Sequence, residues 1–69
     1  MEGDLQQRLG RNLKAWREKR GISQEALAHE LGYHRTYLGA VERGERNLSL
    51  RSVEKLADQL GLEALDLLK

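Results

Sequence analysis

The chain of 69 residues contains no cysteine, and this absence removes two common ways of stabilising a small domain. Neither a disulfide nor a thiolate metal site can form. The two histidines, His29 and His34, lie five positions apart, which is not the spacing of a ligand pair on one helix face. We therefore predict no metal and no cofactor, and we expect a second subunit to supplement the thin core of so short a chain.

Also lacking are a long apolar run and a basic, apolar leader at the N-terminus. The sequence therefore predicts no membrane span and no secretory signal, and a cytoplasmic protein is the expectation. The net charge is only +1, but residues 1–20 hold six Lys/Arg against three Asp/Glu, whereas residues 52–69 hold two against four. A locally basic face would attract phosphate, although a solvated mixed-charge surface explains the same pattern.

Proline is absent as well, and glycines and serines divide the apolar pattern into five segments. Apolar residues recur at helical spacing in these segments, and alternating strand patterns are absent. Ser23 and Ser49 are placed as N-caps, while Gly21, Gly32 and Gly61 follow the last periodic residues as C-terminal stops. We predict an all-α fold in a single domain of residues 1–69. The expected helices cover residues 5–19, 24–31, 35–43, 50–60 and 63–68.

We expect residues 24–43 to form two short helices joined by a turn, and this segment indicates the function. Ala28 stands where the two helices would approach closely, and Gly32 in the turn can adopt positive φ without a steric clash. Apolar residues close the space between the helices, namely Leu27, Leu31, Leu38 and Val41. The pattern is typical of a helix-turn-helix unit, although a plain helical hairpin has similar apolar spacing.

Residues 9–68 resemble the phage-repressor-like (Cro/C1-type, XRE) helix-turn-helix family of bacterial and phage regulators. The matching stretches are LKAWREKRGISQEALAHELG, YHRTYLGAVERGERNLSL and SVEKLADQLGL. Within that family, HRTYLGAVERGERNLSL is most similar to the controller proteins of restriction–modification systems. The resemblance implies a five-helix, lambda-repressor-like domain that binds double-stranded DNA and regulates transcription.

A recognition helix presents its N-terminal residues to base edges in the major groove, and Arg35 and Thr36 open the third expected helix. Arg35 can donate two hydrogen bonds to a guanine, and a cation placed against the helix dipole hints at a function there. Gly39 and Ala40 are small enough for close approach to bases or for tight packing against another helix. We therefore expect base contacts from Arg35, Thr36, Gly39 and Ala40.

Contacts with the DNA backbone are expected mainly from the resemblance, which places Gln24, Arg46 and Asn47 on the phosphates. The N-terminus of the fourth helix offers unpaired amides for a further phosphate. The expected backbone contacts are Gln24, Tyr37, Arg43, Arg46, Asn47, Ser49 and Ser52. A solvated polar loop is the alternative for the loop residues, and His34 is expected to cap the third helix rather than touch phosphate.

The resemblance also implies an ion pair between Arg17 and Glu42 that joins the first helix to the end of the third. The C-terminal segment offers more apolar surface than a thin core needs, from Leu60, Leu62, Leu65, Leu67 and Leu68. We expect a symmetric homodimer interface at Leu62, Leu65 and Leu68, unless all five leucines pack internally.

The expected function is a homodimeric transcriptional regulator that binds a near-palindromic operator, where it would block or contact RNA polymerase. An antitoxin that masks a toxin and regulates its own operon is the alternative, but antitoxins usually carry a disordered extension that we do not expect here. No enzyme is expected, because the sequence has no cysteine nucleophile and no glycine-rich phosphate loop. RNA is disfavoured because the deep, narrow major groove of A-form RNA excludes a helix.

Overall fold

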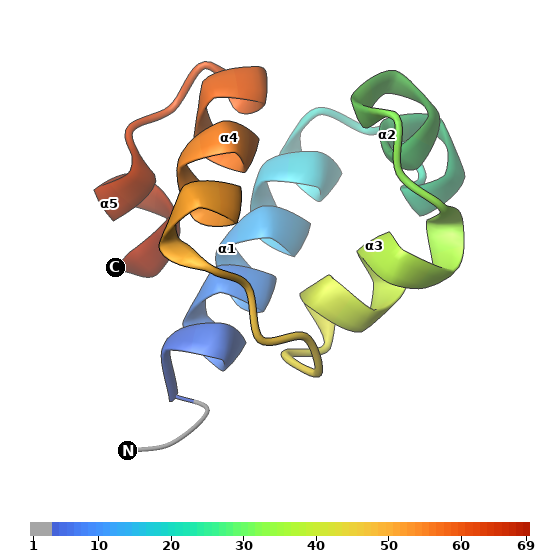
Figure 1. Ribbon diagram of the computed structural model, residues 1–69. Helices are drawn as coiled ribbons and strands as arrows, with labels where there is room; N and C mark the ends of the chain where they lie inside the picture. Colours follow the sequence, from blue (N-terminus) through green and yellow to red (C-terminus); the bar gives the residue numbers. More distant parts are fainter. Residues whose placement is uncertain (1–3) are drawn as a thin grey trace.

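The computed structural model describes residues 4–69, which form five helices (Figure 1). These are α1 (Asp4–Lys19), α2 (Gln24–Leu31), α3 (Arg35–Glu42), α4 (Leu50–Leu60) and α5 (Ala64–Leu68). Residues 4–69 contain no strand, and the predicted all-α class is confirmed. The expected bounds differ from the observed ones by one residue at most, because Arg43 is the C-cap of α3 and Glu63 the N-cap of α5.

Serines cap the starts of α2 and α4, and glycines follow the ends of the same two helices, as the sequence predicts. The Ser23 hydroxyl accepts a hydrogen bond from the Ala26 amide at 3.0 Å, and the Ser49 hydroxyl accepts one from the Ser52 amide at 3.1 Å. Gly32 has a φ of 78° at the end of α2, the left-handed conformation in which glycine avoids a Cβ clash. His34 is the N-cap residue of α3, as expected, but its exposed imidazole makes no capping hydrogen bond.

All five helices contribute to one core. In Figure 1, α1 runs through the middle of the molecule, with α2 and α3 on one side and α4 and α5 on the other. Each fully buried leucine contributes about 1.5–3 kcal/mol through removal of its surface from water. The buried apolar residues are Leu9, Leu13, Leu27, Ala28, Leu38, Val41, Val53, Leu56, Ala57, Leu60 and Leu67.

The apolar stripe of α1 is only partly buried. Leu5, Leu9 and Leu13 recur at the spacing of one helical stripe, but only Leu9 and Leu13 reach the core, while Leu5 in the first turn is 58% exposed. Gly10, between the buried leucines, is also buried and lies against the end of α3. Because glycine has no side chain, the backbones of α1 and α3 approach closely at this point.

The C-terminal leucines divide between core and surface. Leu60 and Leu67 are buried, Leu62 and Leu68 are half-buried, and Leu65 is 74% exposed. The alternative that all five pack internally is therefore wrong.

A side chain of α1 holds α5 in place. The Asn12 amide nitrogen donates to the Leu67 carbonyl at 2.7 Å and to the Lys69 carbonyl at 3.3 Å. Carbonyl groups in the last turn of a helix have no partner within the helix, so Asn12 supplies the missing donor. Within residues 4–69, no helix has the length and hydrophobicity that crossing a bilayer would require.

Candidate nucleic-acid interface

The first turn of α3 points away from the core. Arg35 and Thr36 are exposed there, whereas Leu38 and Val41 on the other side of the helix are buried. Ala40 is half-buried. The helix therefore offers a free N-terminal turn while its apolar face holds it on the domain, which is the arrangement required of a helix that enters a groove.

Tyr37 and Arg46 form an aromatic and cationic pair beside this turn. The guanidinium carbon of Arg46 lies 4.9 Å from the centre of the Tyr37 ring, and the Tyr37 ring meets the Tyr33 ring edge-on at 5.2 Å. A cation over an aromatic ring is attracted by the negative face of the ring. This contact brings the exposed loop arginine to α3 from outside the helix.

Tyr33 and Gln59 link this pair to α4, a connection that the sequence analysis missed. The Tyr33 hydroxyl donates to the Gln59 side-chain oxygen at 3.2 Å, and the Gln59 amide nitrogen donates to the Leu31 carbonyl at 3.2 Å. Burial is the main cause of the raised pKa of Tyr33, and the neighbouring Tyr37 raises it further. The turn between α2 and α3 is thus fastened to α4 by side chains that no local spacing marks.

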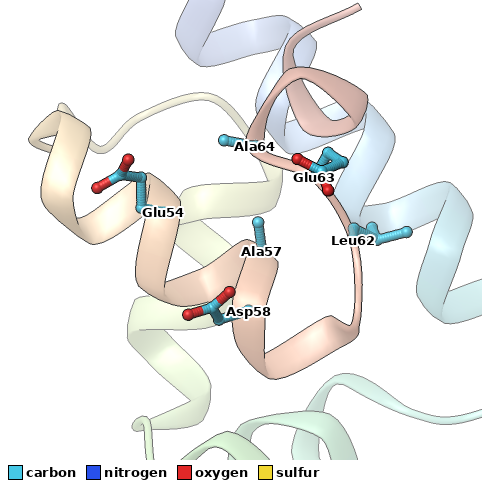
Figure 2. Close-up of a pocket in the computed structure, with 6 residues that line it drawn as sticks. All are labelled: Glu54, Ala57, Asp58, Leu62, Glu63 and Ala64. Carbon is cyan, nitrogen blue, oxygen red and sulfur yellow. The ribbon is translucent and has the colours of Figure 1, made fainter.

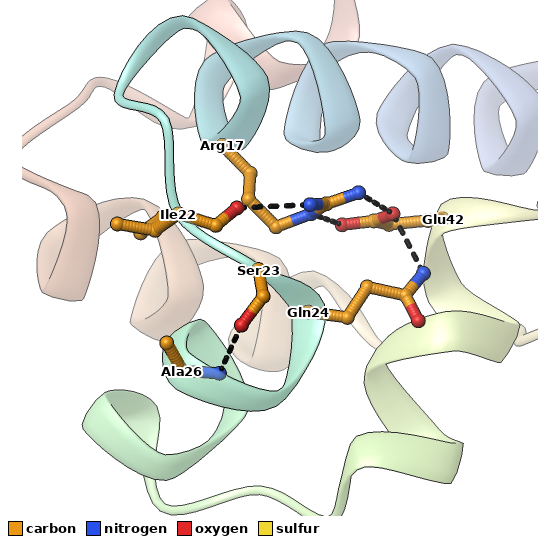
Figure 3. A network of polar contacts seen from close by, with 6 residues as sticks. All are labelled: Arg17, Ile22, Ser23, Gln24, Ala26 and Glu42. Atoms are coloured by element: carbon orange, nitrogen blue, oxygen red, sulfur yellow. Dashed lines mark hydrogen bonds and ion pairs between the residues drawn. The ribbon is translucent and has the colours of Figure 1, made fainter.

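A polar network joins α1, α2 and the last turn of α3 (Figure 3). Arg17 in α1 donates from Nε to Glu42 Oε2 at 2.7 Å and from Nη2 to Glu42 Oε1 at 3.1 Å. Its Nη1 donates to the Ile22 carbonyl at 2.9 Å. The hydrogen bond with Glu42 is the main cause of the raised pKa of Arg17, and burial opposes it. The structure thus contains the ion pair of Arg17 and Glu42, between α1 and the last turn of α3.

Gln24 is the third member of this network, and its place there was not expected. Its amide Nε2 donates to Glu42 Oε1 at 2.9 Å. The Glu42 carboxylate, whose side chain is 2% exposed, therefore accepts from both Arg17 and Gln24. Such sharing suits a buried carboxylate, because a buried charge without partners is strongly destabilising. The network fixes the start of α2 relative to the end of α3.

The side chains of Gln24 and Arg43 also meet at Gly39. Gly39 is buried, and a Cβ built on it would lie 3.2 Å from Arg43 Nη1 and 3.4 Å from Gln24 Oε1. Direct contact between Gly39 and DNA bases therefore requires both side chains to move. The ends of two side chains, rather than the backbone of another helix, therefore occupy the space beside Gly39.

The loop between α3 and α4 carries exposed polar groups. Arg46 and Asn47 are exposed, and Arg43 Nε lies 3.1 Å from Glu45 Oε2 in a surface ion pair. The hydrogen bond between the two raises the pKa of Arg43 and lowers the pKa of Glu45. Because both side chains are more than half exposed, solvent screens the pair, and Arg43 can exchange Glu45 for another anion at little cost.

At the start of α4, the two serines differ in what they can offer a ligand. The Ser49 hydroxyl accepts from the Ser52 amide and donates to Ser52 Oγ at 3.0 Å, so its hydrogen is already used. The Ser52 hydroxyl accepts that bond and keeps its own hydrogen for another acceptor. Ser49 is thus committed to the helix cap, while Ser52 retains a free donor.

Two surfaces of the fold differ in the charges that they expose. Exposed arginines run from α3 into the first turn of α4, at Arg35, Arg43, Arg46 and Arg51. In contrast, three carboxylates surround Ala57 in a hollow between α4 and α5 (Figure 2), lined by Glu54, Ala57, Asp58, Leu62, Glu63 and Ala64. Phosphate would be attracted to the first surface and repelled by the second. In the described part of the chain, no group of three His, Cys, Asp or Glu side chains is placed to hold a metal ion.

Comparison with known proteins also identifies a helix-turn-helix domain. A helix-turn-helix family model matches residues 13–67. The chain is 45% identical over 67 residues to a Neisseria hypothetical transcription factor from Neisseria meningitidis, and 50% identical over 50 residues to Control protein C.BamHI of Bacillus amyloliquefaciens. These alignments cover 97% and 72% of this chain but only 63% and 62% of the relatives, so the chain spans less than two thirds of their length.

A solved structure of the same kind is similar throughout. The crystal structure of the restriction-modification controller protein C.AhdI from Aeromonas hydrophila has a TM-score of 0.76 and 44% sequence identity. The match covers 90% of this chain and 94% of that protein. The resemblance inferred from the sequence is confirmed. The chain belongs to the helix-turn-helix family, and controller proteins of restriction–modification systems are among its relatives.

Proposed function

We propose that this chain is a sequence-specific DNA-binding transcriptional regulator that inserts α3 into the major groove. The observation that carries the proposal is the exposed first turn of α3, with Arg35 and Thr36 free while Leu38 and Val41 anchor the helix. Arg35 donates to O6 and N7 of a guanine, and Thr36 bonds a base edge or contacts a thymine methyl. Ala40 is small enough to face the groove beside them.

The phosphate contacts surround this helix. Gln24 lies at the N-terminus of α2 and Ser52 in the first turn of α4, and both helix ends point unpaired amides outward. The remaining backbone contacts come from the neighbouring loop and from α3, through Tyr37, Arg43, Arg46, Asn47 and Ser49. Ser49 contributes mainly by capping α4, because its hydroxyl hydrogen is already donated to Ser52.

A homodimer would place two copies of α3 on successive turns of the major groove and read a near-palindromic operator. We place the interface on α5 and the preceding loop, at Leu62, Leu65 and Leu68. The strongest support is Leu65, which is 74% exposed although it is apolar. Bound near a promoter, such a dimer would block or contact RNA polymerase. The resemblance to controller proteins of restriction–modification systems implies this mode of action for the chain.

The test is selection of bound sequences from random duplexes, followed by binding titrations. We expect a pair of related half-sites about one helical turn apart, and affinity for the selected duplex about a thousandfold or more above that for a scrambled one. The same selection carried out with the Arg35→Ala variant should yield a less defined motif. Equal affinity for selected and scrambled duplexes would contradict the proposed function.

A further inference from the structure

The backbone conformation of Gly39 does not require glycine. It lies in the interior of α3, and it is not among the glycines of residues 4–69 that adopt positive φ. At such a position glycine destabilises a helix by about 1 kcal/mol relative to alanine. The reason for glycine must therefore lie in what surrounds it.

The surroundings of Gly39 are the ends of two flexible side chains. A Cβ would lie 3.2 Å from Arg43 Nη1, 3.4 Å from Gln24 Oε1 and 3.7 Å from Gln24 Nε2. The contrast with Gly10 is clear, because a Cβ there would meet backbone carbonyl oxygens at 2.5 Å. Gly10 lets two helices touch, whereas Gly39 makes room for side chains from α2 and from the end of α3.

One of these side chains cannot easily move. Gln24 donates to Glu42 at 2.9 Å, and Glu42 is itself held by two hydrogen bonds from Arg17. The amide oxygen of Gln24 points away from Glu42 (Figure 3). Since the amide nitrogen carries two hydrogens, one remains for a ligand after the bond to Glu42 is made. Gln24 thus has a fixed orientation, and Arg43 reaches the same point from its exposed pair with Glu45.

We infer that Gly39 is a positioning residue for DNA binding: without a Cβ, it leaves room over α3 for the Gln24 amide and the Arg43 guanidinium, so that both side chains can meet the same stretch of phosphate backbone. This inference rests on the proposed function. In the Gly39→Ala variant, the new methyl group would lie 3.2 Å from Arg43 Nη1, so the guanidinium must shift by a few tenths of an ångström while Gln24 is held by Glu42. Gly39 itself need not touch a base.

The inference is tested by a thermodynamic cycle on two duplexes, the operator selected for wild type and a scrambled duplex of the same length at low salt. Gly39→Ala should weaken binding to both duplexes by about fivefold, because a hydrogen bond to a charged phosphate is weakened whatever the sequence. In a Gln24→Ala/Arg43→Ala background, adding Gly39→Ala should change neither affinity. Circular dichroism checks that every variant keeps its helices.

Two further measurements separate positioning from direct base contact. The plot of log affinity against log salt should be flatter in Gly39→Ala, as expected when a phosphate contact weakens. In the DNA-free protein, the NMR signals of the Arg43 side chain should shift in Gly39→Ala. If Gly39→Ala instead lowers only the preference for the selected duplex, and still does so in the double-alanine background, the backbone of Gly39 contacts bases and the inference is wrong. If wild type shows no preference for the selected duplex, the proposed function itself fails.

Discussion

Gly10 and Glu42 touch through their backbones, far apart in sequence. A Cβ on Gly10 would lie 2.5 Å from the Glu42 carbonyl oxygen and 2.5 Å from that of Val41. The same Glu42 carries the carboxylate that binds Arg17 of α1 and Gln24 of α2. Two interactions therefore fix the position of the end of α3: its backbone packs on α1, and its buried carboxylate binds side chains of α1 and α2.

Gly10→Ala should destabilise the fold although alanine is the better helix former. Helix propensity alone would add about 1 kcal/mol of stability, but the methyl group overlaps two carbonyl groups that cannot rotate away. We expect a net loss of about 1–3 kcal/mol in the free energy of unfolding, measured by urea titration. A stability equal to or above wild type would show that α1 and α3 can separate without cost.

Much of this architecture follows from the sequence because its signals are local. The helices, the caps at Ser23 and Ser49 and the exposed start of α3 depend on residues within a few positions of each other. Helical spacing puts Leu5 on the same face of α1 as Leu9 and Leu13, yet Leu5 is exposed. Spacing does not reveal how far along α1 the other helices cover that face.

The contacts that the sequence analysis missed are those between distant segments. Gly10 against Glu42, Asn12 against Leu67, and Tyr33 against Gln59 each depend on how two helices cross. The bond from Gln24 to Glu42 is of the same kind, and it changes the interpretation of Gly39. No periodicity marks these residues, so only a three-dimensional arrangement brings them together.

Ser49 and Ser52 should separate stability from DNA binding. Ser49→Ala removes the acceptor for the Ser52 amide, so we expect a loss of about 1 kcal/mol in unfolding free energy. Ser52→Ala keeps that cap but removes the free hydroxyl donor, so DNA affinity should fall with little change in stability. Urea titration and anisotropy on a labelled duplex measure the two effects. If Ser52→Ala binds DNA like wild type, Ser52 makes no phosphate contact.

Arg35 and Arg46 should differ in how their loss affects DNA binding. Arg35→Ala should remove roughly 1–3 kcal/mol of discrimination at one base pair of each half-site while the fold is unchanged. Arg46→Ala should weaken binding to every sequence and reduce the slope of log affinity against log salt by about one unit. Titrations on a set of single-base operator variants at several salt concentrations test both. A change of base preference in Arg46→Ala alone would reverse the two assignments.

Asp66 should contribute an acid-sensitive part of the stability. Its carboxylate accepts from the Glu63 amide at 3.1 Å and lies 3.3 Å from Lys69 Nζ, and these contacts, in that order of importance, lower its pKa. Because the folded pKa is below the unfolded one, the stabilisation is present above the ordinary aspartate range and is lost as pH falls through the folded value.

Asp66→Asn keeps a hydrogen-bond acceptor but cannot titrate. The difference in urea midpoint between wild type and Asp66→Asn should therefore be constant above about pH 5 and shrink below about pH 4. Urea titrations across this range at constant ionic strength measure it. A difference that does not depend on pH would mean that the carboxylate gains nothing from Glu63 and Lys69.

Leu65→Asp should separate the subunits of the proposed dimer without unfolding them. Leu65 is 74% exposed in the first turn of α5, where an acidic side chain is favoured by the helix dipole, so the isolated subunit should tolerate it. Leu50 is a matched control, because it is 80% exposed in the first turn of α4. Sedimentation over a concentration series should show a dimer for wild type and Leu50→Asp and a monomer for Leu65→Asp. If Leu65→Asp sediments like wild type, the subunits meet elsewhere or not at all, and two half-sites would have to be read by another arrangement.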